Sequence, residues 1–220
     1  MREVVDLLAA RAPRLERALK KIARTGGGVA LLGGTLIRTR PRTGTQNRKN
    51  YSGKSKCHGL LVITLTDDRG QLLWASAARP GRTSEITACR HDQLTAKLRA
   101  ASLGAIADLG FIGLDDSDPD ADPAVITGCK AARNRPLTRG QKLANAALAA
   151  VRAPVEHGFA HLKNWRVLGK VRIDPKWGTA LVRALLVLTN REVSRWPMIF
   201  TEVTRPRPAR ASRAPRTPAR

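Results

Sequence analysis

The segment between residues 60 and 77 constrains the fold most tightly. Residues 60–66 are apolar and β-branched, and residues 72–77 form a second apolar run. Between the two runs, Asp67-Asp68-Arg69-Gly70 has the composition of a tight turn. Two runs of this kind joined by a short turn predict an antiparallel hairpin. We therefore expect the chain to build a β-sheet around this pair of strands.

Further strands and helices are predicted on both sides of the hairpin. The other predicted strands lie at residues 29–32, 35–37, 105–108 and 125–126. The predicted helices lie at residues 4–23, 84–101, 138–165 and 179–193. Pro13 is expected to divide the first helix and Pro154 to kink the third. A hairpin, a crossover helix and later strands together predict an α/β fold in which a mixed sheet is flanked by helices.

Positive charge indicates the class of partner. The chain has 40 Lys and Arg residues against 17 Asp and Glu, a formal net charge of +23. This excess favours a polyanion, with nucleic acid first and an anionic membrane surface second. Charge alone leaves RNA binding open, but one Tyr and three Phe offer few platforms for base stacking. No apolar run is long enough to cross a bilayer, so we expect no membrane partner.

Two motifs bear on nucleotide and metal binding. The glycines at residues 26–28 precede a predicted strand, whereas a phosphate-cradling loop follows one, so no nucleotide cofactor is expected. His157 and His161 lie one helical turn apart, as zinc ligands do. However, Gly158 stands where a zinc protease has Glu. We therefore interpret these histidines as polar residues on a helix surface.

The cysteines do not form a metal-binding pattern. Cys57, Cys89 and Cys129 lie far apart in the sequence, and no CxxC pair occurs. Their number is also odd, which does not favour a set of structural disulfides. We interpret them as reduced, small, buried side chains of a cytosolic protein.

Two acidic residues stand out by position. Asp108 lies at the C-terminal end of a predicted strand, where the catalytic groups of open α/β sheets gather. A turn or cap residue before Gly110 is an equally good interpretation of Asp108. Glu156 lies in a predicted helix. Arg152 lies four residues before it and Lys163 seven residues after it, so both share its face of the helix. A lone Glu in such a helix is usually half of a surface ion pair, so the pattern leaves its role open.

Five sequence stretches occur in order, with regular gaps, over roughly residues 25–195. They are LLGGTLI at 31–37, NYSGK at 50–54, RPGRT at 79–83, ADLGFIG at 107–113 and RAPVEHGFAHLKNWR at 152–166. Together they resemble the DDE transposases of bacterial insertion sequences, specifically the insertion-sequence-five group. The resemblance implies a ribonuclease H-like fold in which three carboxylates hold two divalent metal ions, usually Mg²⁺. Such ions offset the charge of a phosphodiester and align its in-line attack.

The resemblance also implies roles for individual residues. Asp108 takes the position of the second acid and Glu156 that of the third, so both are predicted catalytic and metal-binding residues. Arg152, Lys163 and Arg166 lie beside Glu156 in the sequence and are predicted to bind DNA phosphates. A solvated basic face is an equally good interpretation of these three cations.

The sequence departs from the family pattern at the first acid. Gly33 stands where the family has Asp, and glycine has no side chain with which to bind a metal. Asp67 and Asp68, in the next hairpin turn, are poor substitutes by position. After Pro-Gly-Arg-Thr the family has His-Asp, whereas this chain has Ser84 and Glu85. Transposase-type DNA cleavage and strand transfer are therefore expected to be impaired. The alternative is a non-catalytic, DNA-binding remnant of an insertion element.

These features divide the chain into three parts. Residues 1–24 are expected to be the helical remnant of a truncated N-terminal DNA-recognition region. Residues 25–197 are expected to form the catalytic-type domain, and residues 198–220 a basic, Arg/Pro-rich disordered tail. The expected partner is DNA in the bacterial cytoplasm, at the nucleoid, and a homo-oligomer is left open.

Overall fold

One mixed β-sheet organises the molecule. The computed structural model describes residues 2–25, 28–40, 45–115, 123–171 and 174–195, so the predicted tail at 198–220 lies outside the described residues. The sheet runs in the order β2-β3-β1-β6-β7, with β4 and β5 also paired to β3. Its strands are β1 (Val29–Arg38), β2 (Tyr51–Ser52), β3 (Cys57–Thr66), β4 (Leu72–Ala75), β5 (Arg79–Pro80), β6 (Gly104–Ile106) and β7 (Val125–Ile126). β1 is antiparallel to β3 and parallel to β6, which confirms the predicted mixed sheet.

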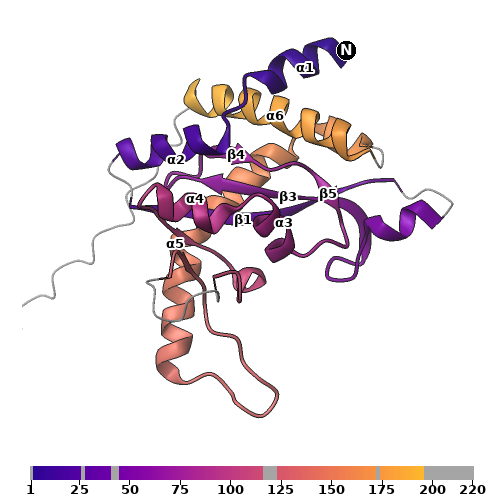
Figure 1. The fold of residues 1–220 in the computed structure, drawn as a ribbon. Helices are drawn as coiled ribbons and strands as arrows, with labels where there is room; N and C mark the ends of the chain where they lie inside the picture. The colour runs from indigo at the N-terminus through magenta and orange to yellow at the C-terminus, as the bar shows by residue number, and fades with distance from the viewer. Residues whose placement is uncertain (1, 26–27, 41–44, 116–122, 172–173, 196–220) are drawn as a thin grey trace, which may run out of the picture.

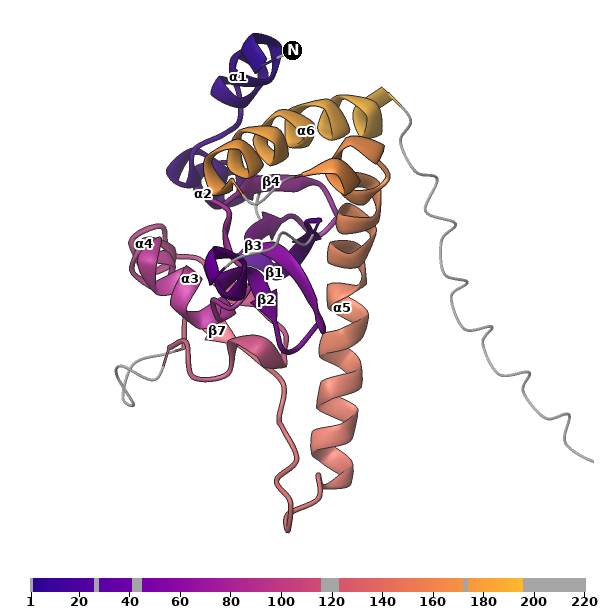
Figure 2. The same cartoon turned by 90° about the vertical axis from the view of Figure 1, so that its right-hand side faces the viewer.

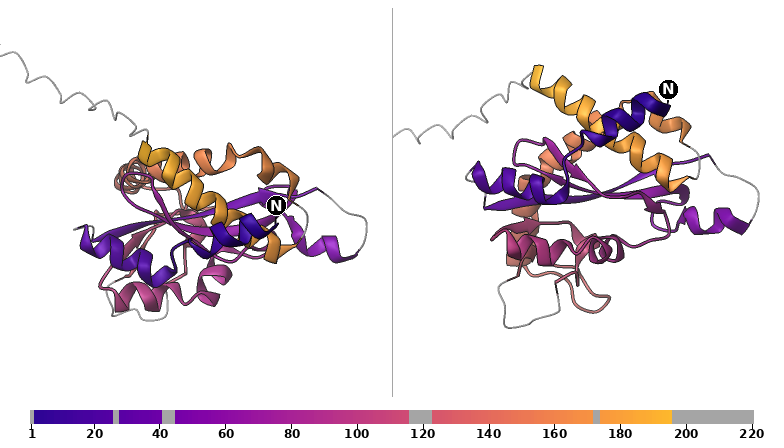
Figure 3. Two further views of the ribbon diagram at one scale, coloured as in Figure 1. Left: turned by 90° about the horizontal axis from the view of Figure 1, so that it is seen from above. Right: turned by 45° about the horizontal axis from the view of Figure 1, so that its top comes forward.

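Helices cover both faces of the sheet (Figure 1). They are α1 (Arg2–Ala10), α2 (Leu15–Arg24), α3 (Glu85–His91), α4 (Leu94–Ala100), α5 (Arg139–Lys163) and α6 (Pro175–Arg195), with short 3-10 turns η1 (Thr45–Asn50), η2 (Leu109–Phe111) and η3 (Arg166–Lys170). One buried cluster joins α2, α3 and α4 to β1 and β3, and a second joins α5 and α6 to the opposite face of the same strands. α1 lies against α6 on the outside (Figure 3). No helix of the described residues is long and apolar enough to cross a membrane.

The predicted hairpin is confirmed as β3 and β4. Its turn is held by Asp67, whose Oδ1 accepts hydrogen bonds from the backbone N–H groups of Arg69 and Gln71, at 3.1 and 2.7 Å. Gly70 completes the turn with φ +82°, a left-handed conformation that favours glycine. Burial raises the pKa of the Asp67 carboxyl, because desolvation outweighs these two hydrogen bonds.

Two predicted elements were divided wrongly. The Gly33-Gly34 pair does not separate two strands, because both residues pair with β3 within the continuous strand β1. The predicted helix at 84–101 is two helices, since Gln93 has φ +52° and interrupts the helix between α3 and α4. The predicted helix at 138–165 is confirmed as α5, with Pro154 inside it. Pro13 does separate α1 from α2, as predicted.

Candidate active site beside β1 and the end of β6

Gly33 and Asp108 both lie against α5. In the register of β1 and β6, Leu31 is the partner of Ile106. Gly33 lies two residues further along β1, and Asp108 lies two residues beyond Ile106, where β6 ends. The backbone of Gly33 faces Val155 and Phe159 of α5, and the Asp108 carboxylate faces Arg152 of the same helix. The roles that the resemblance gives to these two positions stay predictions.

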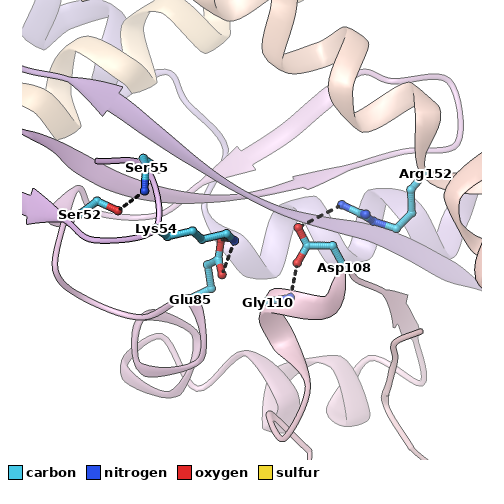
Figure 4. A network of polar contacts seen from close by, with 7 residues as sticks. All are labelled: Ser52, Lys54, Ser55, Glu85, Asp108, Gly110 and Arg152. Carbon is cyan, nitrogen blue, oxygen red and sulfur yellow. Dashed lines mark hydrogen bonds and ion pairs between the residues drawn. The ribbon is translucent and has the colours of Figure 1, made fainter. Parts of the chain in front are cut away.

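The Asp108 carboxylate has two partners. Its Oδ1 accepts a hydrogen bond from the backbone N–H of Gly110 at 2.7 Å, which caps the short turn η2. Its Oδ2 lies 3.8 Å from Nη2 of Arg152, which α5 brings over the strand end (Figure 4). The turn-cap interpretation of Asp108 is therefore confirmed, and its catalytic role stays a prediction.

The space beside Gly33 is filled by α5. A Cβ atom at Gly33 would lie 2.7 Å from Cγ1 of Val155 and 2.9 Å from Cε2 of Phe159. Contacts shorter than 3 Å are essentially never seen for a real Cβ, and Val155 is a short, fully buried side chain that cannot swing away. The helix thus packs directly on the backbone of Gly33 and leaves no room for an aspartate side chain there.

Glu156 lies on α5 next to this contact but points elsewhere. The side chains of Val155 and Phe159 are buried against the sheet, whereas Glu156 is exposed. Among the described residues, Glu156 forms no hydrogen bond or ion pair with Asp108. The structure thus places the predicted third acid on the expected helix, and Arg152, one turn earlier, is the residue that reaches Asp108.

Glu85 is an acidic residue of the site that the sequence analysis did not predict as a site residue. Both of its oxygens accept hydrogen bonds from Nζ of Lys54, at 3.0 and 3.3 Å, and its side chain is only 14% exposed. A Cβ at Gly110 would lie 2.9 Å from Oδ1 of Asp108 and would also touch Oε2 of Glu85. The two carboxylates therefore face each other across Gly110 (Figure 4). The position of Glu85 just after the RPGRT stretch was the sequence signal that could have identified it.

A basic cleft of about 530 Å³ opens beside Glu85. The cations that line it are Arg38, Lys54, Arg82 and Lys163. Of the three predicted DNA contacts, Lys163 lines this cleft and lies 5.7 Å from the centre of the Phe159 ring, and Arg166 is exposed on η3. Arg152 is largely buried, with 15% of its side chain exposed, and turns towards Asp108.

The carboxylates of this region do not form the donor set of a two-metal centre. Among the described residues there is no group of three or more His, Cys, Asp or Glu side chains that could hold a metal ion. Asp108 and Glu85 each have a cationic side chain of this chain as their partner. Hard divalent ions need several oxygen ligands around one point, and two such ions need more still. The side chains present therefore do not fit the pair of ions that the resemblance implies.

A comparison with known proteins identifies the family. A family model described as DDE superfamily endonuclease matches residues 32–190, a span that begins in β1 and ends in α6. No curated protein and no solved structure gave a significant match. The match includes Gly33, Asp108 and Glu156, and it covers the mixed sheet that is compatible with a ribonuclease H-like fold. The chain belongs to the DDE superfamily of endonucleases.

Proposed function

We propose that this chain is a DNA-binding DDE protein of the insertion-sequence-five group whose phosphodiester cleavage is impaired. The family implies a DNA substrate, and the net charge of +23 favours binding to a polyanion. The observation that carries the proposal of impairment is the Arg152–Asp108 pair next to Gly33. The chain has a glycine at the first acid position and a cation on the second acid.

The Arg152 guanidinium opposes metal binding at Asp108 in two ways: it carries a positive charge, and it occupies the space beside the carboxylate. A metal ion that approached Asp108 would have to displace a side chain that is mostly buried and already carries a positive charge. A restored acid at residue 33 would also have to displace Val155 and Phe159. Loss of the first acid and tight packing of α5 thus act in the same direction, and the non-catalytic alternative is the better supported of the two functions.

A weakly active transposase is the second candidate. Three carboxylates, those of Glu85, Asp108 and Glu156, remain in or beside this region, and two of them face each other across Gly110. If Arg152 and Lys54 turned away when DNA binds, Asp108 and Glu85 would be free to act. This candidate predicts slow, Mg²⁺- or Mn²⁺-dependent nicking of DNA that Asp108→Asn abolishes.

A plasmid-nicking assay with matched variants tests the proposal. The native chain is expected to bind supercoiled plasmid without nicking it above background in Mg²⁺ or Mn²⁺. The double variant Gly33→Asp/Val155→Ala restores the acid and removes the nearer of its two close contacts, and it is expected to gain metal-dependent nicking. Gly33→Asn/Val155→Ala has the same shape without the charge and should gain none.

Two outcomes would overturn parts of the proposal. Nicking by the native chain that disappears in Asp108→Asn identifies the active transposase instead. If the double aspartate variant is folded and binds DNA but never nicks it, residue 33 is not the position that decides activity. DNA binding itself is read from its salt dependence, because phosphate contacts release counterions and affinity must fall as salt rises.

A further inference from the structure

The chain from residue 127 to residue 151 projects from the body of the molecule as an arm. It consists of the loop that follows β7 and the first half of α5. Figure 2 shows this part of α5 and the adjoining loop extending well beyond the sheet and the other helices. Leu143 and Val151, on the helical part, are 63% and 50% exposed. The arm therefore contributes little to the core, and its function must be sought on its surface.

Polar contacts hold the two limbs of the arm together. The side chain of Asn145 on α5 accepts a hydrogen bond from the backbone N–H of Cys129 and donates one to its carbonyl, each at 2.8 Å. Thr138 and Gln141 form a reciprocal capping box that fixes the start of α5. An isolated β-bridge pairs Ala132 with Arg135 in the loop. The arm is thus a preorganised element, so a partner need not order it on binding.

All charged side chains of the arm are basic. They are Lys130, Arg133, Arg135, Arg139 and Lys142, and every one is exposed. No Asp or Glu occurs from residue 123 to residue 155. Within the described part of the chain none of these five side chains has an ion-pair partner, unlike Lys97 and Arg99 of the body, which pair with Glu16 and Asp115. Five cations that repel one another on a preorganised arm indicate a polyanionic partner.

We infer that this arm binds the sugar-phosphate backbone of duplex DNA next to the candidate site, an inference that rests on the proposed function. The arm begins at the site, because Arg152 at its base pairs with Asp108. The helix from residue 139 to residue 152 spans about 20 Å, at about 1.5 Å per residue. Duplex DNA presents one phosphate charge per about 1.7 Å of its axis, so every cation along this length can find a phosphate. A duplex held along the arm passes Asp108, just beyond the end of β6.

Two variants of equal charge test the inference on the full chain. The arm variant is Arg133→Ala/Arg135→Ala/Arg139→Ala. The control variant is Arg17→Ala/Lys20→Ala/Arg24→Ala, which removes three exposed cations from α2, away from the arm. Binding to a fluorescent duplex DNA of about three helical turns is measured between about 50 and 300 mM salt, a range over which phosphate contacts change affinity strongly. Circular dichroism melting confirms that both variants are folded.

The arm variant is expected to bind DNA at least tenfold more weakly at low salt than the control variant. Its plot of log affinity against log salt should also be shallower, by about 0.9 for each phosphate that the arm no longer neutralises. Equal affinities and slopes for the two variants would overturn the inference that the arm binds DNA, while leaving DNA binding by the body intact. If the native chain does not bind DNA, both the proposed function and the inference about the arm are overturned. Tighter, arm-dependent binding of a duplex RNA of equal length would replace DNA by RNA as the partner.

Discussion

At the scale of single residues, neighbouring side chains fill the space that an acid at residue 33 would need. Gly33 is buried, and α5 lies so close to it that Val155 and Phe159 occupy the place of its missing side chain. Asp108 is left with Arg152 as the charge that offsets its own. A single substitution of Gly33 in an otherwise unchanged chain must therefore disturb packing before it can restore chemistry.

This packing makes a prediction for Gly33→Ala. The added methyl overpacks the contact with Val155 and Phe159, which is expected to lower the free energy of unfolding by about 1–3 kcal/mol. Gly28→Ala is the matched control, because nothing lies within 4 Å of its Cβ position, and it should change stability by less than about 1 kcal/mol. Urea unfolding of the two variants measures both values. Equal stabilities would show that α5 can move away from β1.

The cysteines give a second prediction at this scale. Burial raises the pKa of the Cys89 thiol to about 12, so the thiol stays neutral at every pH below that value. The reactive species is the thiolate, so Cys89 should resist a thiol reagent in the folded chain from about pH 7 to 9. Cys129 is exposed and should react quickly. Mass spectrometry after brief labelling locates the modified residues, and rapid labelling of Cys89 in the folded chain would contradict the burial.

At the scale of elements, α5 combines two functions along its length. Its second half packs Val155, Phe159 and Leu162 against the sheet and fixes Arg152 over Asp108. Its first half forms the projecting arm and is tied to the preceding loop through Asn145. The two halves form one unbroken helix, so the arm and the residue that faces Asp108 belong to one element.

We predict that Asn145→Ala loosens the arm without unfolding the body. The substitution removes both hydrogen bonds to Cys129, and trypsin should then cleave after Lys130 or Arg133 several-fold faster. Asn164→Ala, at the exposed C-terminal end of the same helix, is the matched control and should leave these cleavage rates unchanged. Limited proteolysis read by mass spectrometry compares them. Unchanged cleavage in Asn145→Ala would mean that the capping box alone holds the loop.

At the scale of the whole molecule, the sheet separates two apolar clusters and gathers the functional groups at one edge. The cluster with α2, α3 and α4 and the cluster with α5 and α6 share β1 and β3, which pair along their length. Asp108 and the base of the arm lie beyond the end of β6, and Glu85 and the basic cleft lie beside the second half of β1. The body therefore holds basic side chains around the two carboxylates of Asp108 and Glu85.

Binding of a polyanion should stabilise this whole structure. A ligand that binds only the folded chain adds about 2.7 kcal/mol to its stability at about one hundred times its dissociation constant. Duplex DNA is therefore expected to raise the Tm by several degrees at about 50 mM salt, and the shift should vanish at about 500 mM salt because the contacts are ionic. Differential scanning calorimetry measures both values. A shift that persists at high salt would indicate binding through apolar rather than phosphate contacts.

Much of the fold could be predicted from local chemistry. The β3–β4 hairpin follows from two apolar runs and an Asp-Gly turn, and the cap of α3 follows from Ser84, whose Oγ accepts a hydrogen bond from the N–H of Thr87. The break at Gln93 could not be predicted, because its φ of +52° is uncommon for a residue other than glycine and nothing in the local sequence signals it. Glu85 was missed because its contact with Gly110 joins segments far apart in the sequence.

By itself, the sequence determined the family, the mixed sheet and the absence of an acid at residue 33, because motif identity, apolar periodicity and residue type are properties of the chain alone. Only the tertiary structure decided which charges meet. The sequence put Arg152 and Glu156 on one helix, and the way in which α5 packs on β1 decided that Arg152 reaches Asp108 while Glu156 faces solvent. Residues four apart lie one above the other on the same helix face, so α5 would have to shift along its axis by about one turn to bring Glu156 to the place of Arg152. The contacts of Val155 and Phe159 with the bare backbone of Gly33 fix the helix against that shift.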